Sequence, residues 1–220
     1  MEKEIQDRRP IRARETRWAT AAARYLRRKG CTPNGISLFS IAFAALSALC
    51  YLAAWRVEDQ IGQRILFIAA AVGIQGRLIC NLLDGMVAVE GGLRSPAGAV
   101  YNELPDRVSD TLLLLGVGYG ITLYPSAIAL GWGCALLAVA TAYIRLLGGT
   151  CGLPQRFSGP MAKQHRMALL TAVSLLAATF PQWSQQGFVA VLWLILVGAF
   201  FTCISRARLI IQDLNAGESP

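Results

Sequence analysis

The acidic residues of this chain are concentrated in one short stretch. Of its 13 Asp and Glu residues, five lie between positions 84 and 110, and none lies between positions 111 and 212. The five are Asp84, Glu90, Glu103, Asp106 and Asp110. The surrounding sequence is strongly apolar, and carboxylates in apolar segments are costly unless they face a cavity or partner charges. Their concentration therefore predicts a functional site.

The spacing within this stretch places polar groups on two helix faces. Asn81 and Asp84 are three residues apart, and Asn102, Asp106 and Asp110 follow at intervals of four, so each set shares one face of a helix. The glycines at positions 91 and 92 predict a loop between two antiparallel neighbours whose oxygens converge. Carboxylate and amide oxygens suit a hard cation such as Mg²⁺ or Mn²⁺, which bridges to substrate phosphates.

Basic side chains are expected close to these oxygens. A divalent cation with Arg and Lys is the usual apparatus of phosphoryl transfer, which depends on positioning and charge neutralisation. The candidates are Arg77, Arg107, Arg145, Lys163 and Arg166. The alternative, that charged residues merely end helices at a membrane surface, stays open for Glu90 and Arg94.

The composition is that of a helical membrane protein. Apolar residues make up 55% of the 220 residues and charged residues 15%, against roughly 45–50% and 25% in globular proteins. Residues 30–55, 111–144 and 167–205 contain no charged side chain, and one span needs about 20 apolar residues. We expect an all-α integral membrane protein with six transmembrane helices, near residues 34–55, 63–90, 97–123, 126–148, 162–181 and 187–211. A disulfide-rich secreted domain and a compact cytosolic enzyme are excluded.

The basic residues indicate the orientation in the membrane. Ten of the 21 Lys and Arg residues lie in the first 29 positions, and the positive-inside rule places such an arm, and with six spans both termini, in the cytoplasm. Residues 18–26 predict an amphipathic helix on the surface of an anionic leaflet. We expect a cytoplasmic arm with this interfacial helix over 1–30, a transmembrane domain over 31–212 and a cytoplasmic tail over 213–220. The expected partner is a lipid bilayer, with no nucleic acid, in a bacterial inner membrane.

Two segments of the chain resemble the motif of the CDP-alcohol phosphatidyltransferase family, D-x-x-D-G-x-x-A-R-x8-G-x-x-x-D-x-x-x-D. The chain reads N-L-L-D-G-M-V-A-V from Asn81 to Val89 and, eight residues later, G-A-V-Y-N-E-L-P-D from Gly98 to Asp106. Thr-Pro-Asn at 32–34 and the basic segment 159–166 are similar to further signatures of that family. The resemblance covers nearly the whole chain.

This resemblance implies transfer of a phosphatidyl group from a CDP-linked lipid, such as CDP-diacylglycerol, to a small acceptor alcohol, with release of CMP. It implies metal ligands at Asn81, Asp84, Asn102 and Asp106. Asp106 is the implied general base, with Asp110 as the competing candidate. The implied substrate-binding positions are Gly85, Ala88, Gly98, Arg77, Arg145, Lys163 and Arg166. The family is commonly dimeric, so a homodimer is a further expectation.

Three positions depart from the family pattern. Asn81 and Asn102 replace the first and third aspartates, and Val89 replaces the arginine. Family members bind two divalent cations with four aspartates, whereas an Asn side chain offers a carbonyl oxygen without a charge. We therefore expect altered metal occupancy, such as one tightly held Mg²⁺ or Mn²⁺ ion. A protein that binds CDP-lipid without turnover is the alternative.

The sequence leaves other interpretations and the acceptor open. Residues 102–110 also resemble a metal motif of membrane prenyltransferases of the UbiA group, which are longer and have a second Asp-rich motif. A scaffold or a transporter would differ from an enzyme in lacking activity dependent on a divalent cation. The basic segment 145–166 favours a phosphorylated acceptor, with phosphatidylglycerophosphate synthesis as the first expectation. His165, the only histidine, is expected to be an interfacial polar residue.

Overall fold

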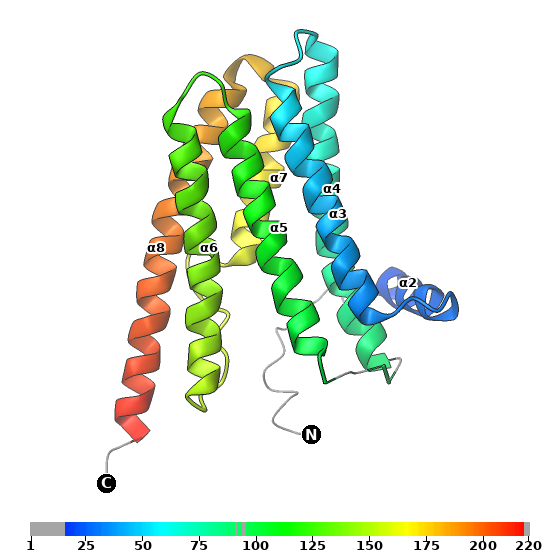
Figure 1. Cartoon of the computed structure of the whole chain (residues 1–220), viewed down its shortest axis with the longest axis vertical. Coiled ribbons are helices and arrows are strands. Elements are labelled where there is room, and N and C mark those ends of the chain that lie inside the picture. Colours follow the sequence, from blue (N-terminus) through cyan, green and yellow to red (C-terminus); the bar gives the residue numbers. More distant parts are fainter. Residues whose placement is uncertain (1–15, 91, 94–95, 218–220) are drawn as a thin grey trace.

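The computed structural model describes residues 16–217 except 91 and 94–95, and every regular element in this part of the chain is helical (Figure 1). The elements are α2 (Arg17–Arg28), α3 (Pro33–Ala54), α4 (Gln60–Glu90), α5 (Gly98–Gly120), α6 (Ser126–Thr150), α7 (Lys163–Thr179), the short 3-10 helix η2 (Pro181–Trp183) and α8 (Ser184–Gly217). The all-helical expectation is confirmed. Most of the expected basic arm (1–15), loop positions 91 and 94, and the end of the tail (218–220) lie outside the described residues.

Local signals set the ends of several helices where the sequence predicted them. Thr32 caps α3 by accepting a hydrogen bond from the Gly35 amide (3.1 Å), and Pro33 occupies the first turn, where its missing N–H costs nothing. Pro125 and Pro181 lie at the turns that separate the later helices. The largest difference is in α8, which was expected at 187–211 and continues to Gly217. Residues 206–216 contain no Gly or Pro to end it.

The six long helices form a closed ring. Each packs against two neighbours, in the spatial order α3, α4, α7, α8, α6, α5 and back to α3. Figure 1 shows them running side by side, with α7 behind α5. This order places α7, which carries Lys163, beside α4 and across the ring from α5. The side chain of Lys163 reaches Asp106 of α5 across the interior of the ring.

Small residues allow some of these helices to approach closely. A Cβ on Gly118 of α5 would lie 2.8 Å from the carbonyl oxygen of Ala127 and 3.1 Å from the Cα of Gly131 in α6. Without a hydrophobic driving force in lipid, membrane helices associate through this kind of close packing of small residues. The contact fixes α5 against α6.

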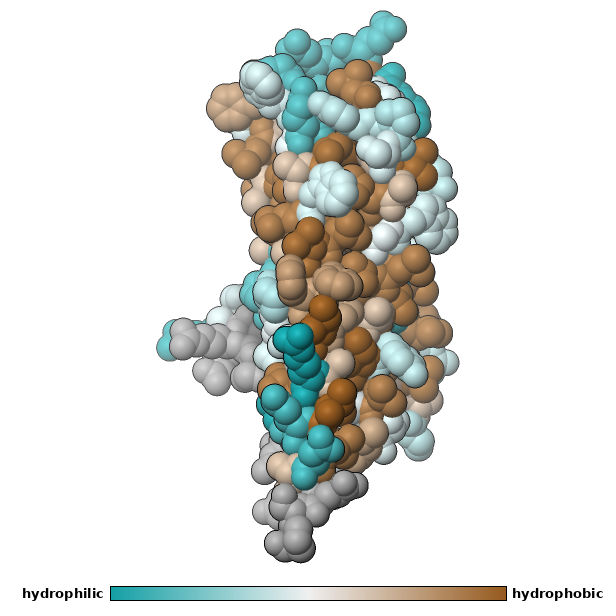
Figure 2. All heavy atoms as spheres, turned by 90° about the vertical axis from the view of Figure 1, so that its left-hand side faces the viewer, coloured by the Kyte–Doolittle hydropathy of each residue, from teal (hydrophilic) through white to brown (hydrophobic). Residues whose placement is uncertain are grey.

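The outer surface of the bundle is apolar. Figure 2 shows one face on which hydrophobic side chains cover the middle, while hydrophilic residues gather toward the ends. Four segments are long and apolar enough to cross a bilayer, namely Pro33–Ala54, Gln60–Val89, Ser126–Thr150 and Pro181–Ala216. α5 and α7 do not meet these criteria, because α5 carries several charges and α7 has only 17 residues. The chain is therefore a multi-pass helical membrane protein.

α2 projects from the side of the bundle, where it packs against the lower part of α4 (Figure 1). Its buried residues Ala19 and Ala23 belong to one apolar cluster with Met86 and Val87 of α4. This contact attaches α2 at the end of the bundle where the acidic stretch lies.

Candidate active site

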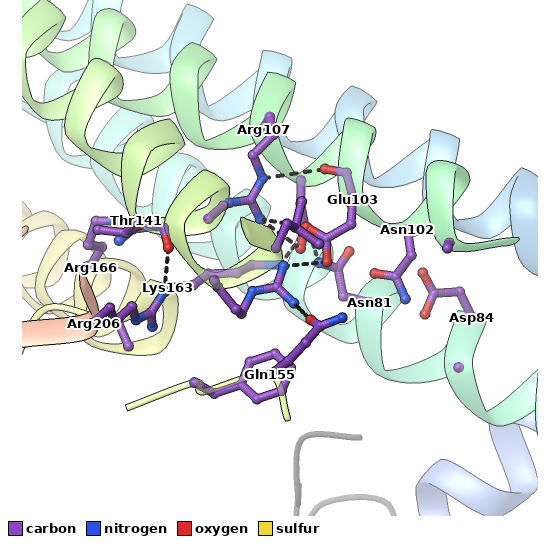
Figure 3. A pocket seen from close by; sticks show the side chains of 18 residues that line it. Asn81, Asp84, Asn102, Glu103, Arg107, Thr141, Gln155, Lys163, Arg166 and Arg206 are labelled. Carbon is purple, nitrogen blue, oxygen red and sulfur yellow. Dashed lines mark hydrogen bonds and ion pairs between the residues drawn. The ribbon is translucent and has the colours of Figure 1, made fainter. Parts of the chain in front are cut away.

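A cavity opens between the helices at the end of the bundle near α2 (Figure 3). Its walls come from α4, α5, α6, α7, α8 and the segment between α6 and α7. The lining includes Asn81, Asp84, Gly85, Asn102, Glu103, Asp106, Arg107, Thr141, Arg145, Gln155, Phe157, Lys163, Arg166 and Arg206. Residues distant in sequence thus meet in one polar cavity within an apolar bundle, which is the usual setting of a binding site.

Asp84 projects from α4 and is almost completely buried, with 4% of its surface exposed. Its Oδ2 accepts a hydrogen bond from the Ser37 hydroxyl of α3. Its Oδ1 is buried without a hydrogen-bond donor among the described residues. In Figure 3 the polar ends of Asp84 and Asn102 point toward one another. A buried carboxylate oxygen without a donor is rare in proteins and marks a place where a cation or a water is expected.

Asp106 projects from α5 and is surrounded by donors. Its Oδ1 accepts hydrogen bonds from Lys163 Nζ and from Asn81 Nδ2, both at 2.5 Å. Arg77 Nη2 lies 3.4 Å from the same oxygen, and Arg107 Nη2 lies 3.6 Å from Oδ2. Asp106 therefore already has cationic partners supplied by the chain, in contrast to Asp84.

A buried ion network lies behind the cavity. Asp110 Oδ1 accepts from Arg77 Nη2 at 2.6 Å, and its Oδ2 accepts from Arg166 Nη2 at 2.8 Å. None of the three side chains exposes more than 1% of its surface. Buried charges persist only when they are paired and hydrogen-bonded. The network therefore holds α4, α5 and α7 together beneath the cavity.

Arg145 of α6 and Arg206 of α8 also line the cavity. Arg145 Nη2 lies 2.5 Å from Glu103 Oε1, and its guanidinium carbon lies 4.9 Å from the centre of the Phe157 ring. Arg145 also donates to the side chain of Gln155. Arg206 of α8 donates to the carbonyl oxygens of Thr141 (2.6 Å) and Ser158 (2.8 Å). These contacts orient two guanidinium groups toward one cavity.

The structure brings most of the predicted site residues together. Asn81, Asp84, Gly85, Asn102, Asp106, Arg145, Lys163 and Arg166 line the cavity. Arg77 and Asp110 lie behind it, in the buried ion network. Ala88 and Gly98 are not among the described residues that line it; one lies near the end of α4 and the other begins α5. His165 is exposed and does not belong to the described lining.

Several residues of the site, Gln155 among them, were missed as site residues by the sequence analysis. Arg206, Thr141 and Phe157 line the cavity, and Ser37 holds Asp84. The motif contains none of them. Arg206 gave one signal, because it is the first charge after the neutral block 167–205. A charge at such a position faces either the membrane surface or a polar cavity.

The donor set fits one divalent cation. No group of three His, Cys, Asp or Glu residues in the described part of the chain could hold a metal ion. However, Mg²⁺ is commonly bound through one or two carboxylates together with waters and substrate phosphates. Asp84, with its unpartnered oxygen, and the side chains of Asn81 and Asn102 in the same cavity meet that requirement.

Comparison with known proteins identifies the relatives of this chain. No family model matches it. The inner membrane protein YnbA of Escherichia coli K12 is 30% identical over 178 residues, which cover 80% of this chain and 83% of YnbA. An archaetidylinositol phosphate synthase of Aeropyrum pernix is 30% identical over 161 residues, 72% of this chain and 74% of that protein. The chain belongs to the CDP-alcohol phosphatidyltransferase family.

Further CDP-alcohol phosphatidyltransferase relatives agree in sequence and fold. A phosphatidylinositol phosphate synthase of Streptomyces avermitilis is 27% identical over 207 residues, 89% of this chain and 78% of that protein. The crystal structure of the Mycobacterium tuberculosis phosphatidylinositol phosphate synthase with CDP-DAG bound has a TM-score of 0.70 at 22% identity, covering 89% of this chain and 94% of that one. A structure of the same synthase with manganese and citrate has a TM-score of 0.69, also at 22% identity, covering 87% of this chain and 88% of that one. The two solved structures share the fold of this chain.

Proposed function

We propose that this protein transfers the phosphatidyl group of CDP-diacylglycerol to the hydroxyl of a small acceptor alcohol and releases CMP. One observation carries the proposal: Asp84, Asp106 and two asparagines meet Lys163 and several arginines in a single cavity of a membrane-embedded bundle. Relatives in the family are named as synthases of phosphatidylinositol phosphate and archaetidylinositol phosphate. A carboxylate beside phosphate-binding cations is the apparatus that such a transfer needs.

In the proposed reaction the acceptor oxygen bonds to the lipid-side phosphorus, and the bond from that phosphorus to the CMP oxygen breaks. Asp106 takes the acceptor proton, because it is the cavity-lining carboxylate at the last motif position. Lys163 and Arg107 flank its carboxylate and are placed to hold phosphate oxygens. A divalent cation held at Asp84 and the asparagine oxygens supplies charge neutralisation for the diphosphate when bound. Asp110 is not assigned this role, because both of its oxygens accept from buried arginines.

The acceptor we propose is a phosphorylated polyol. Arg145 and Arg206 line the same cavity from α6 and α8. Guanidinium groups bind phosphate through paired hydrogen bonds. The names of the relatives favour inositol phosphate as the acceptor to test first, and glycerol 3-phosphate, suggested by the sequence, is the comparison acceptor.

We further propose that all six long helices cross the membrane. α5 and α7 close the ring between helices that are themselves long and apolar enough to span. α2 then lies on the membrane surface, with Trp18 and Tyr25 exposed beside its basic residues. The concentration of basic residues at this end supports a cytoplasmic location of the cavity and of both termini. A bacterial inner membrane is the proposed location.

The test of the activity is CMP release by the purified protein in detergent micelles. CDP-diacylglycerol and Mn²⁺ or Mg²⁺ are supplied with inositol 1-phosphate, glycerol 3-phosphate, inositol or serine as acceptor. We expect CMP release with a phosphorylated acceptor, reduced about 100-fold or more in Asp106→Asn. If CDP-diacylglycerol binds and no acceptor yields CMP, the protein is a lipid-binding relative, and the proposal fails.

A further inference from the structure

The two carboxylates of the cavity have opposite surroundings. Asp106 Oδ1 is bonded to the ammonium group of Lys163 at 2.5 Å. Asp84 is 4% exposed, and its Oδ1 has no donor among the described residues. The donors to its carboxylate are neutral groups, the Ser37 hydroxyl and the backbone amide of Gly85. Among the described residues, Asp106 therefore has ion-pair partners, whereas Asp84 has none.

The charge of the cavity is consistent with this asymmetry. Of the charged side chains that line it, five are basic and three are acidic, so the cavity is positive before any metal ion enters. Asn81 and Asn102 contribute to this balance, because each supplies oxygen without negative charge. Every further cation must therefore enter a site that repels it, and the repulsion is greatest next to Lys163.

Asn81 lies on the same helix as Asp84 and contacts Asp106. Its amide nitrogen donates to Asp106 Oδ1 at 2.5 Å, on the same oxygen as Lys163. The carbonyl oxygen of Asn81 is then the atom left to serve as a metal ligand, one helical turn from Asp84 on α4. An aspartate at position 81 would instead place a second negative charge beside Asp106. The asparagine thus fits an arrangement in which only the Asp84 side receives a metal ion.

We infer that this protein uses one divalent cation, centred on Asp84, and that the ammonium group of Lys163 occupies the place beside Asp106 that a second cation would take. The inference rests on the proposed function, since it assigns both cations to the same diphosphate. In two-metal sites the ions lie about 3.5–4 Å apart and clamp the reacting phosphate from both sides. In this protein, one metal ion and the ammonium group of Lys163 would together neutralise the charge of the diphosphate.

The test counts bound Mn²⁺ by electron paramagnetic resonance, using the full chain in detergent. The signal of free Mn²⁺ during titration gives the number and affinity of bound ions, and exchange coupling reports two ions in close proximity. We expect one equivalent of bound Mn²⁺ per chain, without coupling. Two equivalents of similar affinity with a coupled spectrum would overturn the inference.

A charge deletion at Lys163 tests the role of the ammonium group. Lys163→Gln should raise Mn²⁺ affinity by about tenfold or more, because it removes a positive charge next to the site. Arg156→Gln is the matched control: it removes one positive charge from a residue paired with Asp213 outside the cavity, and should leave the affinity within about twofold. Equal affinities in the two variants would overturn the assignment of Lys163.

A third variant is designed to create the site for two metal ions that the family pattern implies. Asn81→Asp and Asn102→Asp combined with Lys163→Gln should bind a second equivalent of Mn²⁺ and show coupling. A folded triple variant that still binds one ion would contradict the inference, and the wild-type count decides if the variant does not fold. CMP release in the same preparations separates the outcomes. One bound ion without CMP release refutes the proposed function alone, whereas CMP release with two coupled ions refutes this inference alone.

Discussion

Removing the charge of Asp110 should destabilise the fold far more than removing any other carboxylate outside the cavity. Asp110→Asn leaves Arg77 and Arg166 buried at 0% and 1% exposure with a neutral partner in place of the carboxylate that both now contact. Breaking a buried ion pair by removing one partner costs about 3–5 kcal/mol. The guanidinium Nε atoms of both arginines already lack partners in the described structure. The contacts that would remain include the longer one from Arg77 to Asp106 (3.4 Å) and the one from Arg166 to the neutral Met161 carbonyl. We expect a loss in the free energy of unfolding at the upper end of that range.

The assay is reversible unfolding in mixed micelles with increasing SDS, followed by circular dichroism. Asp213→Asn is the control, because the ion pair of Asp213 with Arg156 is at least as short (2.5 Å, against 2.6 and 2.8 Å for the two pairs of Asp110) but has side chains that are 30% and 39% exposed. Exposed pairs contribute about 0.2–1 kcal/mol. If Asp110→Asn is no less stable than Asp213→Asn, the buried network does not hold the helices together and our account of it is wrong.

Three further predictions concern metal, acceptor and topology. Chelation with EDTA should abolish CMP release, and Mn²⁺ or Mg²⁺ should restore it; activity that survives EDTA would contradict a metal-assisted transfer. Arg206→Ala should raise the KM for a phosphorylated acceptor by about tenfold or more, since a hydrogen bond to a charged group is lost, while the KM for CDP-diacylglycerol stays within about twofold; equal effects on both would assign Arg206 to the fold. The exposed thiol of Cys151 should react with an impermeant maleimide in inverted vesicles and not in intact spheroplasts; the reverse pattern would place the cavity on the outer side.

The helices and the polar faces could be predicted from sequence because they depend on local signals. Neutral blocks of a span's length, Pro33, Pro125 and Pro181 determine where helices begin and end. The three- and four-residue spacing determines which side chains share a face. Hence Asp84 and Asp106 were placed in one site before any contact was known. The length of α8 was underestimated, because the hydropathy fades at Arg206 while helix-forming residues continue.

The pairing of the charges could not be predicted in the same way. Asp110 was considered as a base because its spacing matches that of Asp106, yet it lies behind the cavity between two arginines. That difference depends on the order of helices around the ring, which places α7 beside α4. The same holds for Ser37, which reaches Asp84 only because α3 packs on α4. The spacing of residues along one helix does not predict which side chains of another helix they will contact.

The most direct test of the central claim is the mass of the lipid formed from CDP-diacylglycerol and deuterated inositol 1-phosphate. The wild-type protein with Mn²⁺ should form a lipid that contains both the diacylglycerol phosphate and the deuterated acceptor, in an amount equal to the CMP released. Asp106→Asn should form it at about one hundredth of that rate or less. Formation of phosphatidic acid alone, or of the same product at an undiminished rate by Asp106→Asn, would contradict the assignment of this cavity as the site of phosphatidyl transfer.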